Sequence, residues 1–275
     1  MSKNIYTTGL TGFIGKNLLP LLKKDYDQVI NFQRNNKLTI YSRDSAESFA
    51  TSKSIMKLYP AKKIIHLATL YKPKASSLDS TNKLIESNIL FLINILENIL
   101  PSREIDIINI SSYLQLLDVA SQNLYSLTKE VMANYLKNNE YKVSNIYLFD
   151  TFGAGDTRNK VVDIFVRNIL SKKKITIPEN KIFINLTQVN SLCESIVGAL
   201  KLSTGNYSVM SSDTICLEDL ATLIMRLVGY NTEIEQKGIT LDYLNTLTHI
   251  PQNIYQTSST ATLEKKILQH INEIK

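Results

Sequence analysis

Short apolar runs alternate with longer helical patterns along the first half of the chain. Runs rich in Ile, Val, Leu, Phe and Tyr predict strands, and apolar residues spaced by three and four predict helices. The predicted strands are residues 3–8, 28–33, 37–41, 62–67, 105–111 and 142–149, and the predicted helices lie near residues 13–24, 45–58, 79–100 and 123–138. This alternation is typical of an α/β fold with a doubly wound parallel sheet and helices on both faces.

After Asp150 the alternation loosens, which predicts a smaller lobe. The turn-rich stretch 152–156 precedes predicted helices near 160–171, 188–202 and 217–228 and a short strand near 181–186. We divide the chain into residues 1–156 and a carboxy-terminal lobe, residues 157–275, of which about residues 186–210 return to the sheet. Ligands of open α/β sheets bind at the carboxyl ends of the strands, so we expect the chemistry between the sheet and this lobe.

The predicted helix at residues 79–100 is unusually apolar. Between Leu84 and Leu100 it carries Ile85, Ile89, Leu90, Phe91, Leu92, Ile93, Ile95 and Leu96. That is too apolar for a helix with one face in water. The helix is either deeply buried or part of a subunit contact, and the pattern does not separate the two.

The first predicted strand runs directly into a glycine-rich turn. Thr8-Gly9-Leu10-Thr11-Gly12-Phe13-Ile14-Gly15 follows strand 3–8 and opens the first helix. Glycines at this spacing let the backbone approach a pyrophosphate, and the helix start points unpaired N–H groups at it. The turn predicts a dinucleotide-binding domain in residues 1–156, with cofactor contacts from Gly9, Thr11, Gly12, Phe13, Ile14 and Gly15.

The end of the second predicted strand indicates which dinucleotide the chain binds. An acidic residue about 20 residues after the turn would hold the ribose 2′-hydroxyl of NAD, but the chain reads Asn31-Phe32-Gln33-Arg34-Asn35 there. Arg34 can pair with the 2′-phosphate of NADP. We therefore expect NADP (NADPH) rather than NAD. The alternative is that Arg34 is an ordinary exposed loop residue.

Candidate chemistry follows the fifth predicted strand. Ser111-Ser112 ends that strand, and Tyr125-Ser126-Leu127-Thr128-Lys129 opens the next helix, where this spacing puts phenol and ammonium on one face. A second Tyr-to-Lys match, at residues 59–63, contains Pro60, which disfavours a helical Tyr59. The first match is therefore the candidate, because it shares an edge of the sheet with a strand-end serine.

Ser112, Tyr125 and Lys129 suit carbonyl–alcohol redox chemistry. We expect Tyr125 to transfer the proton, and Lys129 to lower the Tyr125 pKa and hold the nicotinamide ribose. Ser112 would hold the substrate oxygen while hydride moves between the nicotinamide and the substrate carbon. The structural alternative for Ser112 is a hydroxyl that caps a local turn.

Composition limits the class of protein without naming a ligand. The 275 residues are 44% hydrophobic and 20% charged, which fits a folded core. The net charge of +6 comes largely from scattered lysines, so neither nucleic acid nor a membrane is indicated as a partner. Cys193 and Cys216 stand alone, which predicts buried thiols, no metal site and no disulfide. No leader or membrane-spanning run is evident, and we expect a cytoplasmic protein.

Together these motifs resemble the extended short-chain dehydrogenase/reductases, the NAD-dependent epimerase/dehydratase family. TGxxGxxG, the serine and YxxxK carry the resemblance, with support from residues 66–69, Asn88 and residues 152–156. It covers residues 3–156 well and the remainder loosely. The resemblance implies a Rossmann-type fold and a homodimer through helices 79–100 and 123–138. It also implies cofactor contacts by Leu67, Ala68, Thr69, Tyr125 and Lys129, and substrate contacts by Thr69, Ser112, Tyr113 and Asp150.

Most members of this branch act on nucleotide-linked sugars. Residues 64–69 and Arg34 make the chain most similar to reductases that convert a nucleotide-linked 4-keto-6-deoxy sugar to a deoxysugar, such as CDP-abequose and CDP-paratose synthases. These enzymes serve surface polysaccharide, such as O-antigen. The chain departs from the family at residues 184–186, residues 190–191 and Asp150. The departures lie in the half that would bind the sugar nucleotide, so they leave its identity open.

Two other functions fit parts of the sequence. A nucleotide-sugar epimerase or dehydratase would use NAD, and an epimerase would hold it tightly and purify with it, whereas a reductase would consume NADPH stoichiometrically. A non-catalytic dinucleotide sensor that binds a partner protein needs neither Tyr125 nor Lys129, so their presence argues against it.

Overall fold

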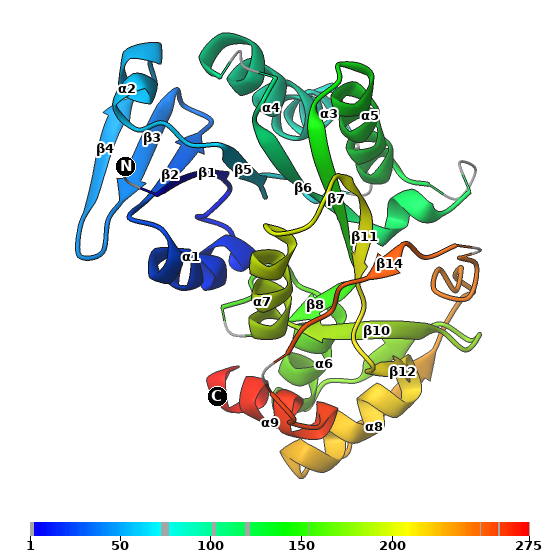
Figure 1. The fold of residues 1–275 in the computed structure, drawn as a ribbon. Coiled ribbons are helices and arrows are strands. Elements are labelled where there is room, and N and C mark those ends of the chain that lie inside the picture. Colours follow the sequence, from blue (N-terminus) through cyan, green and yellow to red (C-terminus); the bar gives the residue numbers. More distant parts are fainter. Residues whose placement is uncertain are drawn as a thin grey trace.

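A large central sheet organises the molecule (Figure 1). The computed structural model describes residues 3–72, 77–100, 103–118, 122–153, 155–247, 249–257 and 259–274. The strands of this sheet lie in the order β14 (Gln252–Asn253), β11 (Gly205–Val209), β7 (Lys142–Leu148), β6 (Asp106–Ser112), β5 (Lys63–His66), β1 (Asn4–Thr8), β2 (Gln28–Gln33), β3 (Lys37–Tyr41) and β4 (Ala46–Ala50).

From β14 to β2 all neighbouring strands are parallel. β1 pairs with β2 on one side, Tyr6 opposite Ile30, and with β5 on the other, Tyr6 opposite Ile64. Parallel pairing continues through β6, β7, β11 and β14. The strand ends at Thr8, His66 and Ser112 therefore meet at one edge of the sheet. This confirms the predicted Rossmann-type α/β fold and places the candidate residues together.

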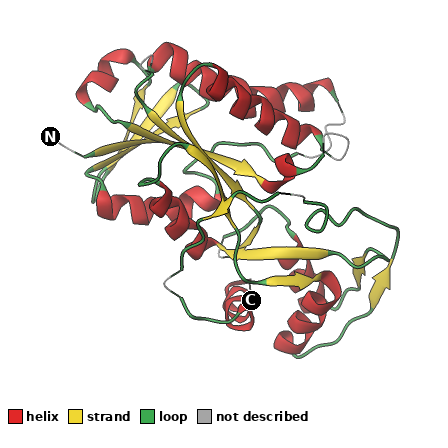
Figure 2. Cartoon of the chain, turned by 45° about the vertical axis from the view of Figure 1, so that its right-hand side comes forward, coloured by secondary structure: helices red, strands yellow, loops and turns green. Residues whose placement is uncertain are grey.

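Helices cover both faces of the sheet (Figure 2). On one face, α1 (Phe13–Asp25) and α7 (Val189–Ala199) pack on apolar residues of β1, β5, β6 and β7. On the other face lie α2 (Lys53–Leu58) and α5 (Leu124–Asn138), together with a helical segment that starts at α3 (Leu78–Ile85). No helix in the described part of the chain is long and apolar enough to cross a membrane.

The predicted helix at residues 45–58 was wrong in its first half. Residues 46–50 form β4, which pairs antiparallel with β3, and β3 pairs antiparallel with β2. The Oγ1 atom of Thr39 lies 3.1 Å from Oγ of Ser48 across this hairpin. Pairing with a neighbouring strand therefore overrides the weak helical pattern, and the sheet is parallel only up to β2.

The apolar helix at residues 79–100 is interrupted by wider turns. α3 continues as the π-helical η1 (Glu86–Leu90), then α4 (Phe91–Asn94) and the π-helical η2 (Ile95–Ile99). Leu84, Leu92 and Leu96 are fully buried, whereas Leu90 is 51% exposed. Most of the segment is therefore core, which fits the deeply buried reading, and the subunit contact stays a prediction.

A second lobe lies beside the carboxyl edge of the sheet (Figure 1). It contains β8 (Asp150–Phe152), β10 (Phe183–Gln188) and β12 (Thr214–Cys216) in one small sheet, β9 (Ile175–Ile177) and β13 (Ile234–Gln236) in another, and the helices α6 (Val161–Leu170), α8 (Leu217–Val228) and α9 (Leu263–Ile274). Its apolar core is formed mainly by α6, α8 and α9. β11, although late in the chain, pairs with β7 in the central sheet.

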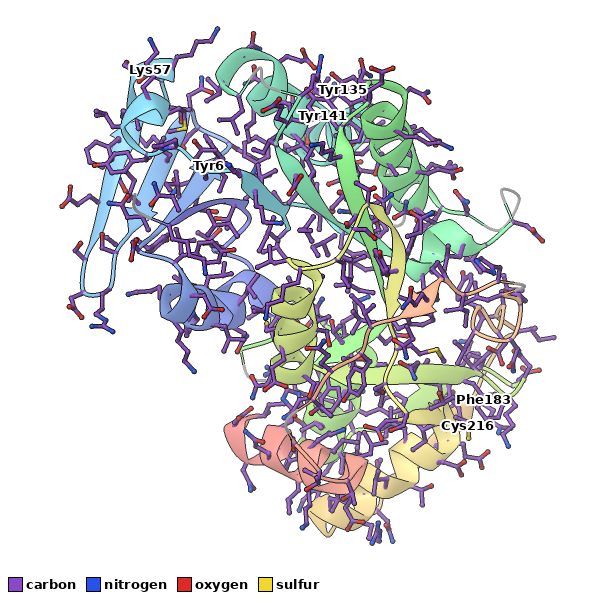
Figure 3. All side chains as sticks on the ribbon, in the orientation of Figure 1. Tyr6, Lys57, Tyr135, Tyr141, Phe183 and Cys216 are labelled. Carbon is purple, nitrogen blue, oxygen red and sulfur yellow. The ribbon has the colours of Figure 1, made fainter. Side chains whose placement is uncertain are left out.

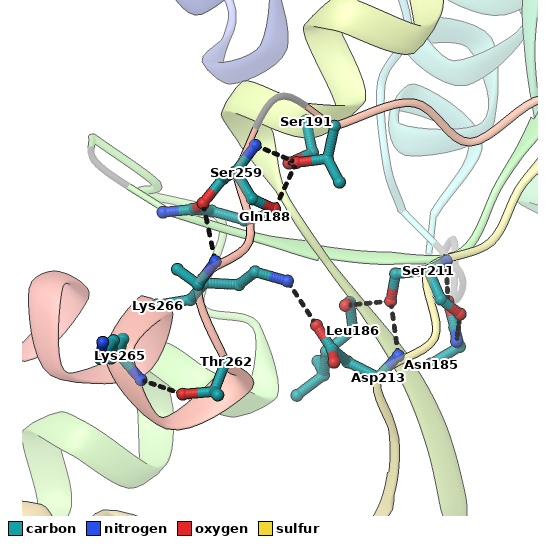
Figure 4. A network of polar contacts seen from close by, with 12 residues as sticks. Asn185, Leu186, Gln188, Ser191, Ser211, Asp213, Ser259, Thr262, Lys265 and Lys266 are labelled. Atoms are coloured by element: carbon teal, nitrogen blue, oxygen red, sulfur yellow. Dashed lines mark hydrogen bonds and ion pairs between the residues drawn. The ribbon is translucent and has the colours of Figure 1, made fainter.

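Polar contacts between buried side chains hold α9 in this lobe. Lys266 Nζ donates to Asp213 Oδ2 at 2.6 Å, next to the contacts of Asn185 with Ser211 (Figure 4). On the same helix, Nε2 of His270 lies 2.8 Å from Asp163 Oδ1 on α6. Both cysteines are free and buried, as the sequence predicts.

Candidate active site

The glycine turn lies where β1 ends, and two of its glycines are required by close packing. Gly9 has φ +79°, and a Cβ there would lie 2.6 Å from the Ala68 nitrogen. A Cβ on Gly15 would lie 2.3 Å from the Gly9 oxygen. Neither position has room for a side chain. The turn is therefore pressed against the backbone that follows β5.

The amino end of α1 is free to bind an anion. Gly12 is the N-cap and provides no side-chain hydrogen bond to the first turn. Thr11 and Gly12 are exposed, and a Cβ on Gly12 would meet only the Gly9 oxygen, at 3.4 Å. Uncapped N–H groups and the helix dipole favour negative charge at such a position. The turn thus fits a cofactor pyrophosphate.

The turn between β2 and β3 carries Arg34 and borders a cavity. A cavity of about 240 Å³ opens beside it, lined by Phe32, Gln33, Asn36, Thr51, Phe91, Asn94, Ile95 and Ile99. The Gln33 side chain donates to Thr39 Oγ1 at 2.8 Å and so is turned onto β3. Arg34 is exposed and has no hydrogen bond or ion pair among the described residues. Its guanidinium is available to a ligand.

Tyr125 lies beside the two candidate hydroxyls. Its phenol is close enough to Ser112, at the end of β6, and to Thr69, which follows β5, for both hydroxyls to lower its pKa. The sequence separates these three residues widely, and the parallel sheet brings them together. Ser112 Oγ also accepts from the Leu114 nitrogen at 3.3 Å, so it caps the local turn as well. The capping role of Ser112 is therefore observed, and its role toward a substrate oxygen stays a prediction.

Asn88 holds Thr69 in place. In the π-helical turn η1, the Asn88 side chain accepts from Thr69 Oγ1 at 3.1 Å and from the Leu70 nitrogen at 2.7 Å. It donates to Thr128 Oγ1 on α5 at 3.0 Å. π-Helical turns are often found at functional sites. This one links the loop after β5 to the helix that carries Tyr125.

Lys129 is buried one helical turn after Tyr125. Its Nζ donates to the Ile110 oxygen at 2.7 Å, and burial lowers its pKa to about 8. Burial also raises the pKa of Tyr125 to about 12, although the nearby Thr69 and Ser112 hydroxyls act in the opposite direction. The expected net lowering of the Tyr125 pKa by Lys129 is therefore wrong for the protein without cofactor, because desolvation of the phenol is the larger effect.

Tyr113 and Asp150 form a pair on the other side of Ser112. The Tyr113 phenol and the Asp150 carboxyl are close enough to shift each other's pKa, and burial, the larger cause, raises the pKa values of both groups. The Tyr113 ring stacks on Phe149 with centroids 5.0 Å apart. The pair therefore presents polar atoms from a rigid support, which suits the substrate-binding role implied by the resemblance.

Three residues at the site were missed in the sequence. The Tyr71 ring packs edge-on against Tyr125, with centroids 4.9 Å apart, and Lys160 Nζ lies 3.9 Å from the Tyr71 centroid. Arg158 lies 4.4 Å from the Phe13 ring. The basic residues come from the second lobe and the rings from the first half. No local pattern marks these residues, because their partners are distant in sequence.

No cluster of His, Cys, Asp and Glu that could hold a metal ion occurs among the residues that the structure describes. His66 is the histidine nearest the site, and its Nδ1 lies 2.8 Å from Thr8 Oγ1. Burial and the Lys129 charge lower the His66 pKa well below its ordinary value. His66 is therefore neutral at pH 7 and supports the end of β1.

Comparison with known proteins identifies relatives of this chain. The family model described as NAD dependent epimerase/dehydratase family matches residues 5–189. A CDP-abequose synthase from Yersinia pseudotuberculosis is 27% identical over 250 residues, 86% of each chain. Two solved UDP-glucose 4-epimerases have the same fold: one from Thermotoga maritima with UDP-glucose (18% identity, TM-score 0.75, 99% and 98% of the two chains), and one from Thermus thermophilus with NAD (15% identity, TM-score 0.69, 98% of each chain).

Proposed function

The chain belongs to the NAD dependent epimerase/dehydratase family, and from that premise we propose that it reduces a nucleotide-linked 4-keto-6-deoxy sugar with NADPH. The observation that carries the proposal is the buried Tyr125 phenol beside Ser112 and Thr69 at the carboxyl edge of the sheet, one helical turn before Lys129. A phenol with a pKa of about 12 is protonated at pH 7. A protonated donor is what reduction of a ketone requires.

Each residue has a role in that reaction. The reduced nicotinamide supplies a hydride to the carbonyl carbon. Tyr125 gives its proton to the carbonyl oxygen, and Ser112 holds that oxygen as negative charge develops on it. Lys129, cationic at pH 7, holds the nicotinamide ribose and favours return of a proton to Tyr125. The rigid support of Thr69 by Asn88 keeps the phenol oriented.

NADPH is preferred over NADH because of the turn after β2. Arg34 is exposed and unpaired among the described residues, and the Gln33 side chain is turned away onto Thr39. No carboxylate occupies either position to repel a 2′-phosphate, and a guanidinium binds phosphate with charge-assisted hydrogen bonds. The structural relative from Thermus thermophilus binds NAD, which supports a nicotinamide dinucleotide as the cofactor. The preference for NADPH rests on Arg34.

The substrate assignment rests on the CDP-abequose synthase relative, which matches 86% of the chain. We take from it a nucleotide-linked deoxysugar as product, for surface polysaccharide such as O-antigen. Tyr113 and Asp150 would contact the sugar beside Ser112. Asn185, at one of the positions where the chain departs from the family, has a structural partner, since it donates to the Ser211 oxygen at 2.8 Å.

The test is a turnover measurement on the purified protein. With NADPH and a panel of nucleotide-linked 4-keto-6-deoxy sugars, we expect absorbance at 340 nm to fall in step with formation of the deoxysugar, one NADPH per product. Protein that purifies with bound NAD and interconverts sugar epimers without net cofactor loss would support the epimerase alternative. Absence of both reactions across the panel contradicts the proposal.

We also propose a homodimer through the helices that flank the redox set. Leu90 on η1 and Val131 on α5 are 51% and 50% exposed, and Leu127 on α5 is also exposed. Tyr135 on α5 and Tyr141, labelled near each other in Figure 3, donate from Oη to Glu97 on η2 at 2.8 and 3.0 Å and so join the two helical segments. Light scattering at micromolar concentration should give the dimer mass, and Val131→Glu should give a monomer. If the wild-type protein and Val131→Glu are both monomers, the proposed homodimer is contradicted.

A further inference from the structure

Tyr71 covers Tyr125, the proposed proton donor. Its ring packs edge-on against the Tyr125 ring, with centroids 4.9 Å apart and an angle of 76° between the ring planes. Tyr125 is 7% exposed, whereas Tyr71 is 40% exposed. The Tyr125 ring also belongs to a buried apolar cluster with Leu84, Leu114 and Leu117. A substrate cannot pass through that cluster, so the approach to the phenol runs past Tyr71.

Tyr71 is held from both parts of the molecule. On the side of the sheet, Asn88 fixes the preceding residue, because its Oδ1 accepts from the Leu70 nitrogen at 2.7 Å and its Nδ2 donates to the Leu70 oxygen at 3.2 Å. From the second lobe, Lys160 Nζ lies 3.9 Å from the centre of the Tyr71 ring. These contacts order the ring before any ligand binds. A ligand that packs on Tyr71 therefore loses little affinity to ordering the side chain.

The size of a sugar brings it against this ring. Proton transfer places the carbonyl oxygen within about 2.6–3.2 Å of the Tyr125 hydroxyl. A pyranose is a rigid ring, so its other carbons have to extend from that carbonyl away from the buried cluster around Tyr125. They extend toward the accessible side, which Tyr71 occupies. The sugar and Tyr71 are therefore in contact during the reaction.

The chemistry of the two surfaces is complementary. The faces of a pyranose carry C–H groups, and the face of an aromatic ring is negatively polarised. Packing C–H groups on such a ring removes apolar area from water and adds a favourable electrostatic contact. Lys160 marks a face of Tyr71 on which positively polarised groups bind. The ring thus suits the C–H face of a sugar.

We propose that Tyr71 is a specificity-determining residue that packs on the sugar ring of the substrate. The inference rests on the proposed function, which places a nucleotide-linked sugar at Tyr125, and it adds the residue that recognises the sugar itself. A nucleotide without its sugar has no group to pack on this ring. Tyr71 therefore contributes to affinity for the sugar and not to affinity for the nucleotide.

The experiment separates the sugar from the nucleotide. CDP, UDP, dTDP and GDP, each alone and linked to glucose, are titrated by calorimetry into the full-length protein with NADPH, which cannot reduce these sugars. The pair that wild type binds most tightly gives a ratio, the dissociation constant of the nucleotide divided by that of the nucleotide sugar. In Tyr71→Leu we expect this ratio to fall about fivefold, with the nucleotide's own dissociation constant unchanged.

Two further variants control for the ring and for exposure. Tyr71→Phe keeps the aromatic ring and should retain the ratio. Tyr230→Leu is the matched control, because Tyr230 is 39% exposed and lies beside a lysine, with Lys172 Nζ 5.5 Å from its ring centre. This variant should leave the ratio unchanged.

The outcomes separate this inference from the proposed function. If Tyr71→Leu weakens the nucleotide and the nucleotide sugar by the same factor, Tyr71 only supports its loop and the inference is overturned. A sugar that adds no affinity in wild type overturns it as well. Should Tyr71→Leu lack a cooperative thermal transition, Tyr71→Met replaces it, and the same ratio decides. Failure of the proposed function is seen in another measurement, the absence of NADPH oxidation with 4-keto sugars in a protein that keeps the Tyr71-dependent ratio.

Discussion

Two lysines are buried in the described part of the chain, one at the redox set and one in the second lobe. Lys129 is 2% exposed and donates to a neutral backbone oxygen, that of Ile110. Lys266 is 6% exposed and pairs with the Asp213 carboxylate at 2.6 Å. A buried ammonium without a carboxylate is destabilising, whereas one with a carboxylate is compensated. The first arrangement is expected where the charge serves a ligand, and the second where it holds elements together.

The same contrast separates the two regions more widely. At the carboxyl edge of the sheet, polar groups are left available, as at Arg34 and the uncapped start of α1. In the second lobe, α9 is held by Lys266 and by His270, which lies 2.8 Å from Asp163. Polar residues of the first region are therefore candidates for function, and those around α9 for stability.

The largest expected effect is on turnover. Tyr125→Phe removes the proton donor and should lower kcat about a thousandfold while leaving NADPH affinity within about twofold. Tyr135→Phe removes an exposed phenol on the same helix and should leave kcat unchanged. Comparable kcat values for Tyr125→Phe and wild type would contradict the role of Tyr125 as the proton donor.

The next effect is on stability in the second lobe. Lys266→Met leaves the partly buried Asp213 without its cation and should lower the free energy of unfolding by about 2 to 3 kcal/mol. Adding Asp213→Leu should restore much of that loss. Denaturant titrations measure both, and NADPH affinity should not change. An unchanged free energy of unfolding together with weaker NADPH binding would contradict the structural role of Lys266.

Lys129→Met should change stability in the opposite direction. The Lys129 pKa is about 8 in the folded protein, against an ordinary value of 10.5. Between these values the unfolded chain binds the proton and the folded protein does not, so the destabilisation by the buried charge is full below pH 8 and disappears as the pH approaches 10.5. We expect the variant to be about 2 kcal/mol more stable at pH 7, with a gap that narrows as the pH rises, and to lose turnover.

Lys137→Met, an exposed change at the end of the same helix, is the control for Lys129→Met and should alter neither quantity. Thermal unfolding at pH 7 and at higher pH decides the matter. A Lys129→Met protein less stable than wild type at pH 7 would show that the buried ammonium is compensated after all.

The smallest effect concerns cofactor choice. Arg34→Gln should weaken NADPH binding about tenfold and leave NADH binding unchanged, because only NADPH carries the 2′-phosphate. Arg43→Gln, at the far end of the β3 hairpin, should change neither affinity. If Arg34→Gln lowers the affinity for NADPH and for NADH equally, Arg34 does not bind the 2′-phosphate.

The sequence predicts the first region better than the second. The glycine turn, the strand ends and the Tyr125 helix depend on local spacing, and the sheet brings them together once its strands are parallel. β4 was missed because Ala46-Glu47-Ser48-Phe49-Ala50 lacks β-branched residues and becomes a strand only by pairing with β3.

Other features depend on contacts that no local pattern contains. Phe13 and Arg158, or Asp163 and His270, are far apart in the chain and are brought together by packing of the second lobe. The raised Tyr125 pKa is of the same kind, because it follows from the depth of burial rather than from the neighbouring Lys129.

The most direct test of the account follows the hydride. NADPH deuterated at the transferable position of the nicotinamide is given to the protein with a nucleotide-linked 4-keto-6-deoxy sugar, and the product is examined by NMR and mass spectrometry. The account predicts one deuterium, bound to C4 of the sugar, for each NADPH consumed by wild type, and none with Tyr125→Phe over the same time. A sugar product that forms without deuterium at C4 would contradict it.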